Sequence, residues 1–212
     1  MIDLYVINLP ERLDRLEQIK QNFAQYNNIN LIIIEAVKCE PGYIGCTRSF
    51  KKCVSIAKEK KLPYVIIVED DCLPLGNFQN RLTNILEYLE SDNNWSLFLG
   101  GVKKSNRVLF TCPFEKESIY AIKKGHSSHF SIFRSSIYDD VLNYDENIFS
   151  SDTFWHDKYP ALITIPFLAH QTDGFSTITQ KYCKSFDKIY NDTEQNLLAS
   201  LPRKRKIHKK IF

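Results

Sequence analysis

The pattern of apolar and polar positions predicts an alternation of strands and helices through the first half of the chain. Compact β-prone runs occupy 4–9, 31–37, 64–68 and 95–99. Apolar residues at helical spacing lie between them, namely Leu13, Leu16, Ile19, Phe23 and Tyr26, then Phe50, Cys53, Val54 and Ala57, then Phe78, Leu82, Ile85, Leu86 and Leu89. Strands that alternate with helices favour right-handed crossovers, so we predict an α/β fold with a mostly parallel mixed sheet flanked by helices.

The second half of the chain is less regular. It predicts short strands at 108–111, 118–122, 129–134 and 162–165. A short helix is expected after Ser135 or Ser136, and a last helix after Asp192 or Thr193, because hydroxyl and carboxylate side chains cap helix starts. Since we find no internal repeat and no linker, we predict one domain over 1–200 and a basic tail over 201–212.

The distribution of charge and the spacing of the cysteines narrow the expected partners and the expected location of the protein. The net charge is +3, but six basic residues lie in the last ten positions, and the rest of the chain would carry about −3. We therefore expect no nucleic-acid partner, and at most a weak contact between the tail and a membrane surface. The six cysteines have no spacing typical of zinc ligands. The opening MIDLYVINLP lacks a basic signal region, so we expect reduced thiols and a cytoplasmic location.

The stretch VIIVEDDCLP at 65–74 carries the clearest chemical signal. Glu69, Asp70 and Asp71 follow an apolar strand directly, and open α/β sheets bind ligands at the carboxyl ends of their strands. In an extended backbone Glu69 and Asp71 share one side and Asp70 faces the other. Such an acid-x-acid pair suits a hard divalent cation such as Mg²⁺ or Mn²⁺. A solvated loop or carboxylates that cap the next helix are the alternative interpretations.

Several common motifs are absent from the sequence. There is no G-x-G-x-x-G and no G-x-x-x-x-G-K-[ST], so neither dinucleotide-binding nor P-loop chemistry has motif support. The nucleophile elbow G-x-S-x-G is also missing, which argues against a serine hydrolase.

The order of several blocks resembles glycosyltransferase family 25, which includes lipopolysaccharide sugar transferases and collagen galactosyltransferases. The resemblance covers most of 3–178. The blocks are YVINLPERLDRLEQIKQNF at 5–23, PGYIGCTRSF at 41–50, YVIIVEDDCLP at 64–74, LG at 99–100, HFSIFRSSIYDDVL at 129–142, SSDTFW at 150–155 and PFLAHQTDGFSTI at 166–178. The chain departs from the family pattern at Phe50, where the family has histidine, and it is short for the family.

The resemblance implies a GT-A fold, one domain that binds a nucleotide-sugar and a divalent cation. It implies a metal-dependent transfer of a sugar from a donor, expected to be a UDP-sugar, to a hydroxyl of a glycan or protein acceptor, with inversion. Mn²⁺ or Mg²⁺ is the expected cofactor. Two alternatives stay open. One is a Mg²⁺-dependent nucleotidyl or phosphoryl transferase, against which the missing P-loop counts. The other is a binding module that keeps the fold without catalysis, against which the intact carboxylates at 69–71, Asp152 and His170 argue.

We assign metal-binding and donor-binding roles from the residues and the resemblance together. Asp71 is the expected metal ligand, Glu69 or Asp70 a second ligand or an orienting group, and His170 a third ligand, since a neutral imidazole suits Mn²⁺. The expected donor-binding residues are Asn8, Arg12, Arg15, Gly45, Asp70, Gln171 and Ser176. Either arginine could instead be a helix charge paired with Glu11 or Asp14.

The catalytic base is expected at Asp152. Inversion needs a carboxylate that takes the proton of the acceptor hydroxyl, and Asp152 matches the aspartate of the family's loop. Asp157 is a weaker candidate. A ring of the aromatic pair Phe154 and Trp155 could stack on a sugar face. The alternatives are that Asp152 caps a helix and that Trp155 packs in the core.

Overall fold

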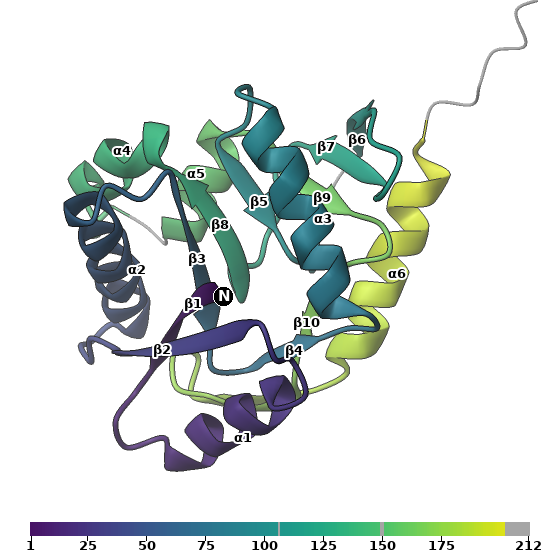
Figure 1. Cartoon of the computed structure of the whole chain (residues 1–212). Coiled ribbons are helices and arrows are strands. Elements are labelled where there is room, and N and C mark those ends of the chain that lie inside the picture. Colours follow the sequence, from purple (N-terminus) through teal and green to yellow (C-terminus); the bar gives the residue numbers. More distant parts are fainter. Residues whose placement is uncertain (106, 149–150, 202–212) are drawn as a thin grey trace, which may run out of the picture.

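The computed structural model describes residues 1–105, 107–148 and 151–201, without the side chains of Ser151, Asp152 and His156. Its centre is an eight-stranded sheet with the strand order β2-β1-β3-β8-β5-β9-β7-β6 (Figure 1). These strands are β1 (Ile2–Asn8), β2 (Ile29–Glu35), β3 (Tyr64–Glu69), β5 (Leu97–Leu99), β6 (Val108–Cys112), β7 (Ile119–Ile122), β8 (Phe130–Arg134) and β9 (Ala161–Thr164).

Helices cover both faces of this sheet, and two small sheets lie beside it. The helices are α1 (Leu13–Phe23), α2 (Gly42–Glu59), α3 (Phe78–Ser91), the short 3-10 turn η1 (Ser135–Ile137), α4 (Tyr138–Asn143), α5 (Ser151–Lys158) and α6 (Phe186–Ala199). The small sheets pair β4 (Cys72–Pro74) with β10 (Ala169–Gln171), and β11 (Gly174–Ser176) with β12 (Lys181–Cys183).

The predicted α/β fold with a mixed sheet flanked by helices is confirmed. Parallel pairing joins β1 to β2, β1 to β3, and β5 to β9, whereas the other four neighbouring pairs are antiparallel. The antiparallel pairs come from β8, which lies between β3 and β5, and from β7, which lies between β9 and β6. The strands β1, β3 and β5 therefore still run in one direction, and their carboxyl ends meet at one edge of the sheet.

Alternation along the central strands builds a core on each face of the sheet. In β3, Val65 and Ile67 pack on the face covered by α2, α4, α5 and α6, while Ile66 and Val68 pack under α1 and α3. This split follows from the period of two in a strand. Continuous apolar runs such as that of β3 are typical of strands buried on both sides.

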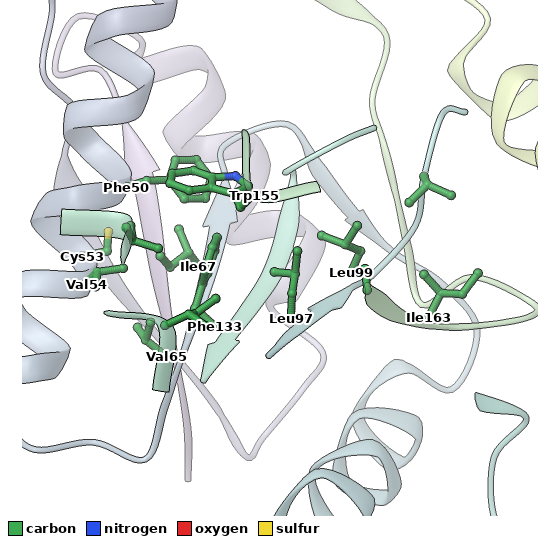
Figure 2. Packing of buried hydrophobic residues seen from close by; sticks show 14 of the residues in the cluster. Phe50, Cys53, Val54, Val65, Ile67, Leu97, Leu99, Phe133, Trp155 and Ile163 are labelled. Carbon is green, nitrogen blue, oxygen red and sulfur yellow. The ribbon is translucent and has the colours of Figure 1, made fainter. Parts of the chain in front are cut away.

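Trp155 belongs to the first of these cores rather than to an open ligand site. Its side chain is 1% exposed, and its ring centroid lies 5.9 Å from that of Phe50 and 5.4 Å from that of Phe133 (Figure 2). Phe50 therefore fills core volume next to Trp155. Burial excludes the alternative in which Trp155 stacks on a sugar ring.

Some helix boundaries differ from the prediction. The last helix begins at Phe186, several residues before the predicted cap, because Asp173 accepts hydrogen bonds from the backbone N–H groups of Ser185 and Phe186 (2.9 and 3.0 Å). The helix α2 begins at Gly42, well before Phe50, the first apolar residue of its predicted helical spacing. The helix α5 and the short strands β4, β10, β11 and β12 were not predicted.

The structure also bears on the expected state of the thiols and on contact with a membrane. No disulfide joins the six cysteines. Among residues 1–105, 107–148 and 151–201, no helix combines the length and the apolar character that a membrane span requires. The basic tail beyond Leu201 lies outside the described residues, so its predicted contact with a membrane stays a prediction.

Candidate functional site

A cavity of about 530 Å³ opens at the sheet edge where β1, β3 and β5 end. Most of the residues that the sequence assigned to the site line it, and these are Arg12, Arg15, Glu69, Asp70, Asp71, Gln171 and Ser176. They come from the segments after β1 and β3 and from the β10–β11 region. Segments far apart in sequence therefore converge on one cavity, in the position typical of ligand sites in α/β folds.

Asp70 and Asp71 are bound to an arginine and two amides. Arg15 donates to Asp70 Oδ1 (2.7 Å) and Asp71 Oδ2 (3.4 Å). Asn8 Nδ2 donates to Asp70 Oδ2 (2.9 Å), and Gln171 Nε2 lies 3.3 and 3.2 Å from the two oxygens of Asp71. Asn8 thus acts on the site through Asp70, and every oxygen of the two aspartates has an N–H donor.

Arg15 compensates for the desolvation of these carboxylates. Asp70 and Asp71 are each 8% exposed. Burial raises the pKa of Asp71, and the charge of Arg15 opposes that rise. Because a buried carboxylate without a counter-charge is costly, the guanidinium lowers the cost of burying the two aspartates side by side.

The described residues do not fit a bound divalent cation in this arrangement. The carboxylate oxygens of Asp70 and Asp71 face hydrogen-bond donors, and Arg15 already supplies a positive charge. Over the described ranges 1–105, 107–148 and 151–201, no three His, Cys, Asp or Glu side chains come together as metal ligands. A metal at Glu69, Asp71 and His170 stays a prediction, and we derive no chemistry through it.

His170 lies apart from the residues that line the cavity. Its ring stacks on Tyr190 at 4.5 Å between centroids and 13° between planes, and its Nδ1 lies 3.2 Å from Asp187 Oδ1. Successive side chains of a strand alternate, so Gln171 points to Asp71 and His170 to α6. The Nε2 atom is buried and has no hydrogen-bond partner among the described residues.

A buried polar network positions Gln171. Tyr190 OH donates to Gln171 Oε1 (3.0 Å), and Ser127 Oγ lies 2.9 Å from Tyr190 OH and 2.8 Å from His129 Nδ1. His129 Nε2 lies 3.0 Å from Ala169 O. A carbonyl oxygen only accepts, so Nε2 carries the proton and Nδ1 accepts.

This network defines which end of the Gln171 amide faces Asp71. Asp71 accepts from Nε2 of Gln171, so Oε1 faces the hydroxyl of Tyr190. Burial lowers the pKa of His129 to about 3, and the imidazole is therefore neutral at physiological pH. Ser127, His129 and Tyr190 hold the amide in place without adding charge to the cavity.

The hairpin of β11 and β12 closes one side of the cavity. The carbonyl oxygen of Phe175 accepts from Arg12 (3.3 Å) and Arg15 (2.8 Å). Arg12 also makes two bonds to Asp14, at 2.8 and 2.7 Å. Of the two arginines, Arg15 therefore reaches the carboxylates, while Arg12 has the helix-pairing role that the sequence left open.

Gly45, Ser176 and Asp152 are the remaining residues that the sequence assigned to the site. Gly45 does not line the cavity; a Cβ there would lie 2.3 Å from the carbonyl oxygen of Val37, so the glycine permits close packing of α2 on the loop after β2. Ser176 lines the cavity and accepts from the N–H of Thr179 (3.2 Å). Asp152 lies in α5, but its side chain is outside the described part, so its role as base stays a prediction.

Lys103 is a cavity residue that the sequence reasoning missed. It follows Gly100 and Gly101 at the carboxyl end of β5. The rule that singled out the end of β3 also applies to β5, so the signal was present. Ser127 and Tyr190 had no comparable signal, because only the fold brings them to Gln171.

No protein-family model and no curated protein matches the chain. Three solved structures that resemble it are A197 from STIV (13% identity over 87% of this chain and 95% of that one, TM-score 0.49), a glycosyltransferase involved in the glycosylation of the major capsid of PBCV-1 (11%, 72% and 72%, 0.41) and apo UDP-glucose pyrophosphorylase (8%, 91% and 79%, 0.37). Since all three TM-scores lie below 0.5, these likenesses carry no argument about family or function.

Proposed function

We propose that this protein is a glycosyltransferase that takes a sugar from a nucleotide-sugar donor, expected to be a UDP-sugar, and passes it to a hydroxyl of a glycan or protein. The observation that supports the proposal most is the convergence of Arg15, Glu69, Asp71 and Gln171 on one cavity at the strand ends. These residues belong to separate blocks of the family 25 resemblance. A cavity of about 530 Å³ is within the range of small-molecule sites.

The proposed roles follow from charge and position. Arg15, held by Asp70 and Asp71, would present its guanidinium to a phosphate of the donor, since arginine matches phosphate geometry. Gln171 would position Asp71 and hydrogen-bond to the donor. Transfer with inversion needs a base for the acceptor proton, and Asp152 remains the candidate on the grounds of the resemblance.

The metal ion and the type of transfer reaction each need a separate test. Mn²⁺ or Mg²⁺, which would stabilise the leaving diphosphate if it bound, remains a prediction because the described residues do not fit a cation. A nucleotidyl transferase is the second candidate function, since the same cavity could hold a nucleotide. It differs in releasing pyrophosphate from a nucleoside triphosphate.

The first experiment is a thermal-shift panel of nucleotide-sugars with the full chain, with and without Mn²⁺. A donor at a hundred times its dissociation constant stabilises the folded state by about 2.7 kcal/mol. For a chain of this size the melting temperature should then rise by about 5 to 10 °C. A panel without any shift would contradict the proposal.

The second experiment measures sugar release and transfer with the donor found in the panel. Asp71→Asn should lose activity while it stays folded, because the amide cannot keep the pairing with Arg15. Asp3→Asn is the matched control, since Asp3 lies at the opposite end of β1 and is exposed. Equal activity of both variants would remove Asp71 from the mechanism.

A further inference from the structure

The basic residues of the cavity differ in their pairing. Four of them line it, namely Arg12, Arg15, Lys38 and Lys103. Arg12 pairs with Asp14, Arg15 with Asp70 and Asp71, and Lys38 with Glu11. Over the part of the chain that the structure describes, Lys103 makes no ion pair.

The backbone of Lys103 is held in place beside the cavity. Its N–H donates to His126 O (2.9 Å), and its carbonyl oxygen accepts from Thr193 Oγ1 (2.9 Å). Gly101, two residues before it, lies so close to β10 that a Cβ would be 2.4 Å from the carbonyl oxygen of Ala169. The segment is therefore packed tightly, and the position of Lys103 is set by its surroundings.

The side chain of Lys103 is half-buried and lies near the site. Its ammonium lies 5.4 Å from the centre of the Phe186 ring, which also lines the cavity. Burial is the main cause that raises the pKa of Asp71, and the positive charge of Lys103 is among the causes that oppose it. The field of the ammonium thus reaches the end of β3.

We propose that Lys103 binds the diphosphate of the donor and neutralises the charge that develops on the leaving nucleoside diphosphate. This inference rests on the proposed function. A half-buried cation without an ion pair favours an anionic ligand, and a diphosphate placed between Lys103 and Arg15 would receive positive charge from both sides. In this arrangement Lys103 and Arg15 supply the positive charge that the sequence analysis assigned to a metal ion.

Lys103 assists the transfer of the sugar, in which one bond forms and another breaks. The acceptor hydroxyl oxygen forms a bond to the anomeric carbon while the bond from that carbon to the phosphate oxygen breaks. The electron pair of the broken bond stays on the diphosphate, whose new negative charge Lys103 meets. The proton of the acceptor goes to the base, for which Asp152 is the candidate. Preorganised charges of this kind stabilise a transition state without further reorganisation.

The test is calorimetric titration of the full chain with three probes: UDP, uridine and inorganic pyrophosphate. Lys103→Met keeps the length of the side chain but removes its charge, and Lys104→Met is the matched control because Lys104 is exposed and does not line the cavity. We expect UDP and pyrophosphate to bind Lys103→Met about ten- to a hundredfold more weakly than wild type. Uridine should bind all three proteins equally, and Lys104→Met should match wild type throughout.

The outcomes separate this inference from the proposed function. Unchanged binding of pyrophosphate and UDP to Lys103→Met overturns the role of Lys103, as does a wild-type chain that binds neither probe. Equal weakening of uridine binding would show a structural effect and also overturn it. If pyrophosphate binding depends on Lys103 but no nucleotide binds, the lysine site stands and the proposed function fails. A melting temperature near that of wild type confirms that Lys103→Met is folded.

Discussion

The neutral, buried His129 should make this protein lose stability as the pH falls below about 6.5. Its side chain is 0% exposed, and burial lowers its pKa from an ordinary value of 6.5 to about 3. In the folded state Nε2 donates to Ala169 O and Nδ1 accepts from Ser127. In the unfolded chain the same imidazole takes up a proton near pH 6.5.

The sign and the magnitude follow from proton linkage. The stabilising contribution is complete above pH 6.5 and is lost progressively as the pH falls toward 3, because only the unfolded state binds the proton in that window. Each unit of pH below 6.5 costs about 1.4 kcal/mol. Between pH 7 and pH 5, His129 should therefore lower the free energy of unfolding by about 2 kcal/mol.

Chemical denaturation at pH 7, 6 and 5 measures this effect, with His129→Gln as the comparison. The variant keeps an N–H that can reach the carbonyl oxygen of Ala169, and it has no group that titrates in this range. It should be less stable than wild type at pH 7 by about 1 kcal/mol, the usual net value of a hydrogen bond. The other titratable groups, Asp71 included, are common to both proteins.

The difference between the two proteins across the pH range therefore isolates His129. We expect wild type to lose about 2 kcal/mol more than His129→Gln between pH 7 and pH 5. Parallel losses in the two proteins would refute the reasoning, because they would mean that the folded state accepts the proton as readily as the unfolded state does.

Three further predictions concern Tyr190, Gly45 and Mn²⁺. Tyr190→Phe should lower the free energy of unfolding by about 1 to 3 kcal/mol, because Gln171 Oε1 loses the closer of its two hydroxyl contacts (3.0 Å) and keeps only Ser127 Oγ at 3.4 Å. Tyr138→Phe is the control, because the hydroxyl of Tyr138 has no partner among the described residues; it should change the free energy of unfolding by less than about 0.5 kcal/mol, and equal effects of the two substitutions in denaturant titrations would contradict this. Gly45→Ala should destabilise by about 1 to 3 kcal/mol, since its Cβ would lie 2.3 Å from a carbonyl oxygen and the helix must shift; an unchanged melting temperature would count against it. Mn²⁺ without donor should leave the melting temperature unchanged, whereas a rise that Asp71→Asn abolishes would show that the paired guanidinium yields to a cation.

The strand–helix order of the first half could be predicted because each element there obeys a simple period. The acidic end of β3 was also visible from sequence, since three carboxylates directly follow a buried strand. Four short strands were not predicted: β4 in the first half of the chain and β10, β11 and β12 in the second are three residues long each. Strands of that length have too few positions for an alternating pattern to stand out.

The direction of β8 could not be predicted from the sequence. Its residues predict a strand, but nothing in them indicates that it runs antiparallel between β3 and β5. Strand order and direction depend on pairings between segments far apart in the chain, and local periodicity does not report them. The positions of the antiparallel strands within the mixed sheet could not be predicted for that reason.

By itself, then, the sequence determined the α/β class, the apolar faces of the first three helices and the carboxylates at the end of β3. The tertiary structure decided which charges meet. It brought Arg15 rather than Arg12 to Asp70 and Asp71, turned His170 toward Tyr190, and placed Lys103 at the cavity without an ion pair among the described residues. Pairing and burial are properties of three-dimensional proximity, and the order of residues alone does not contain them.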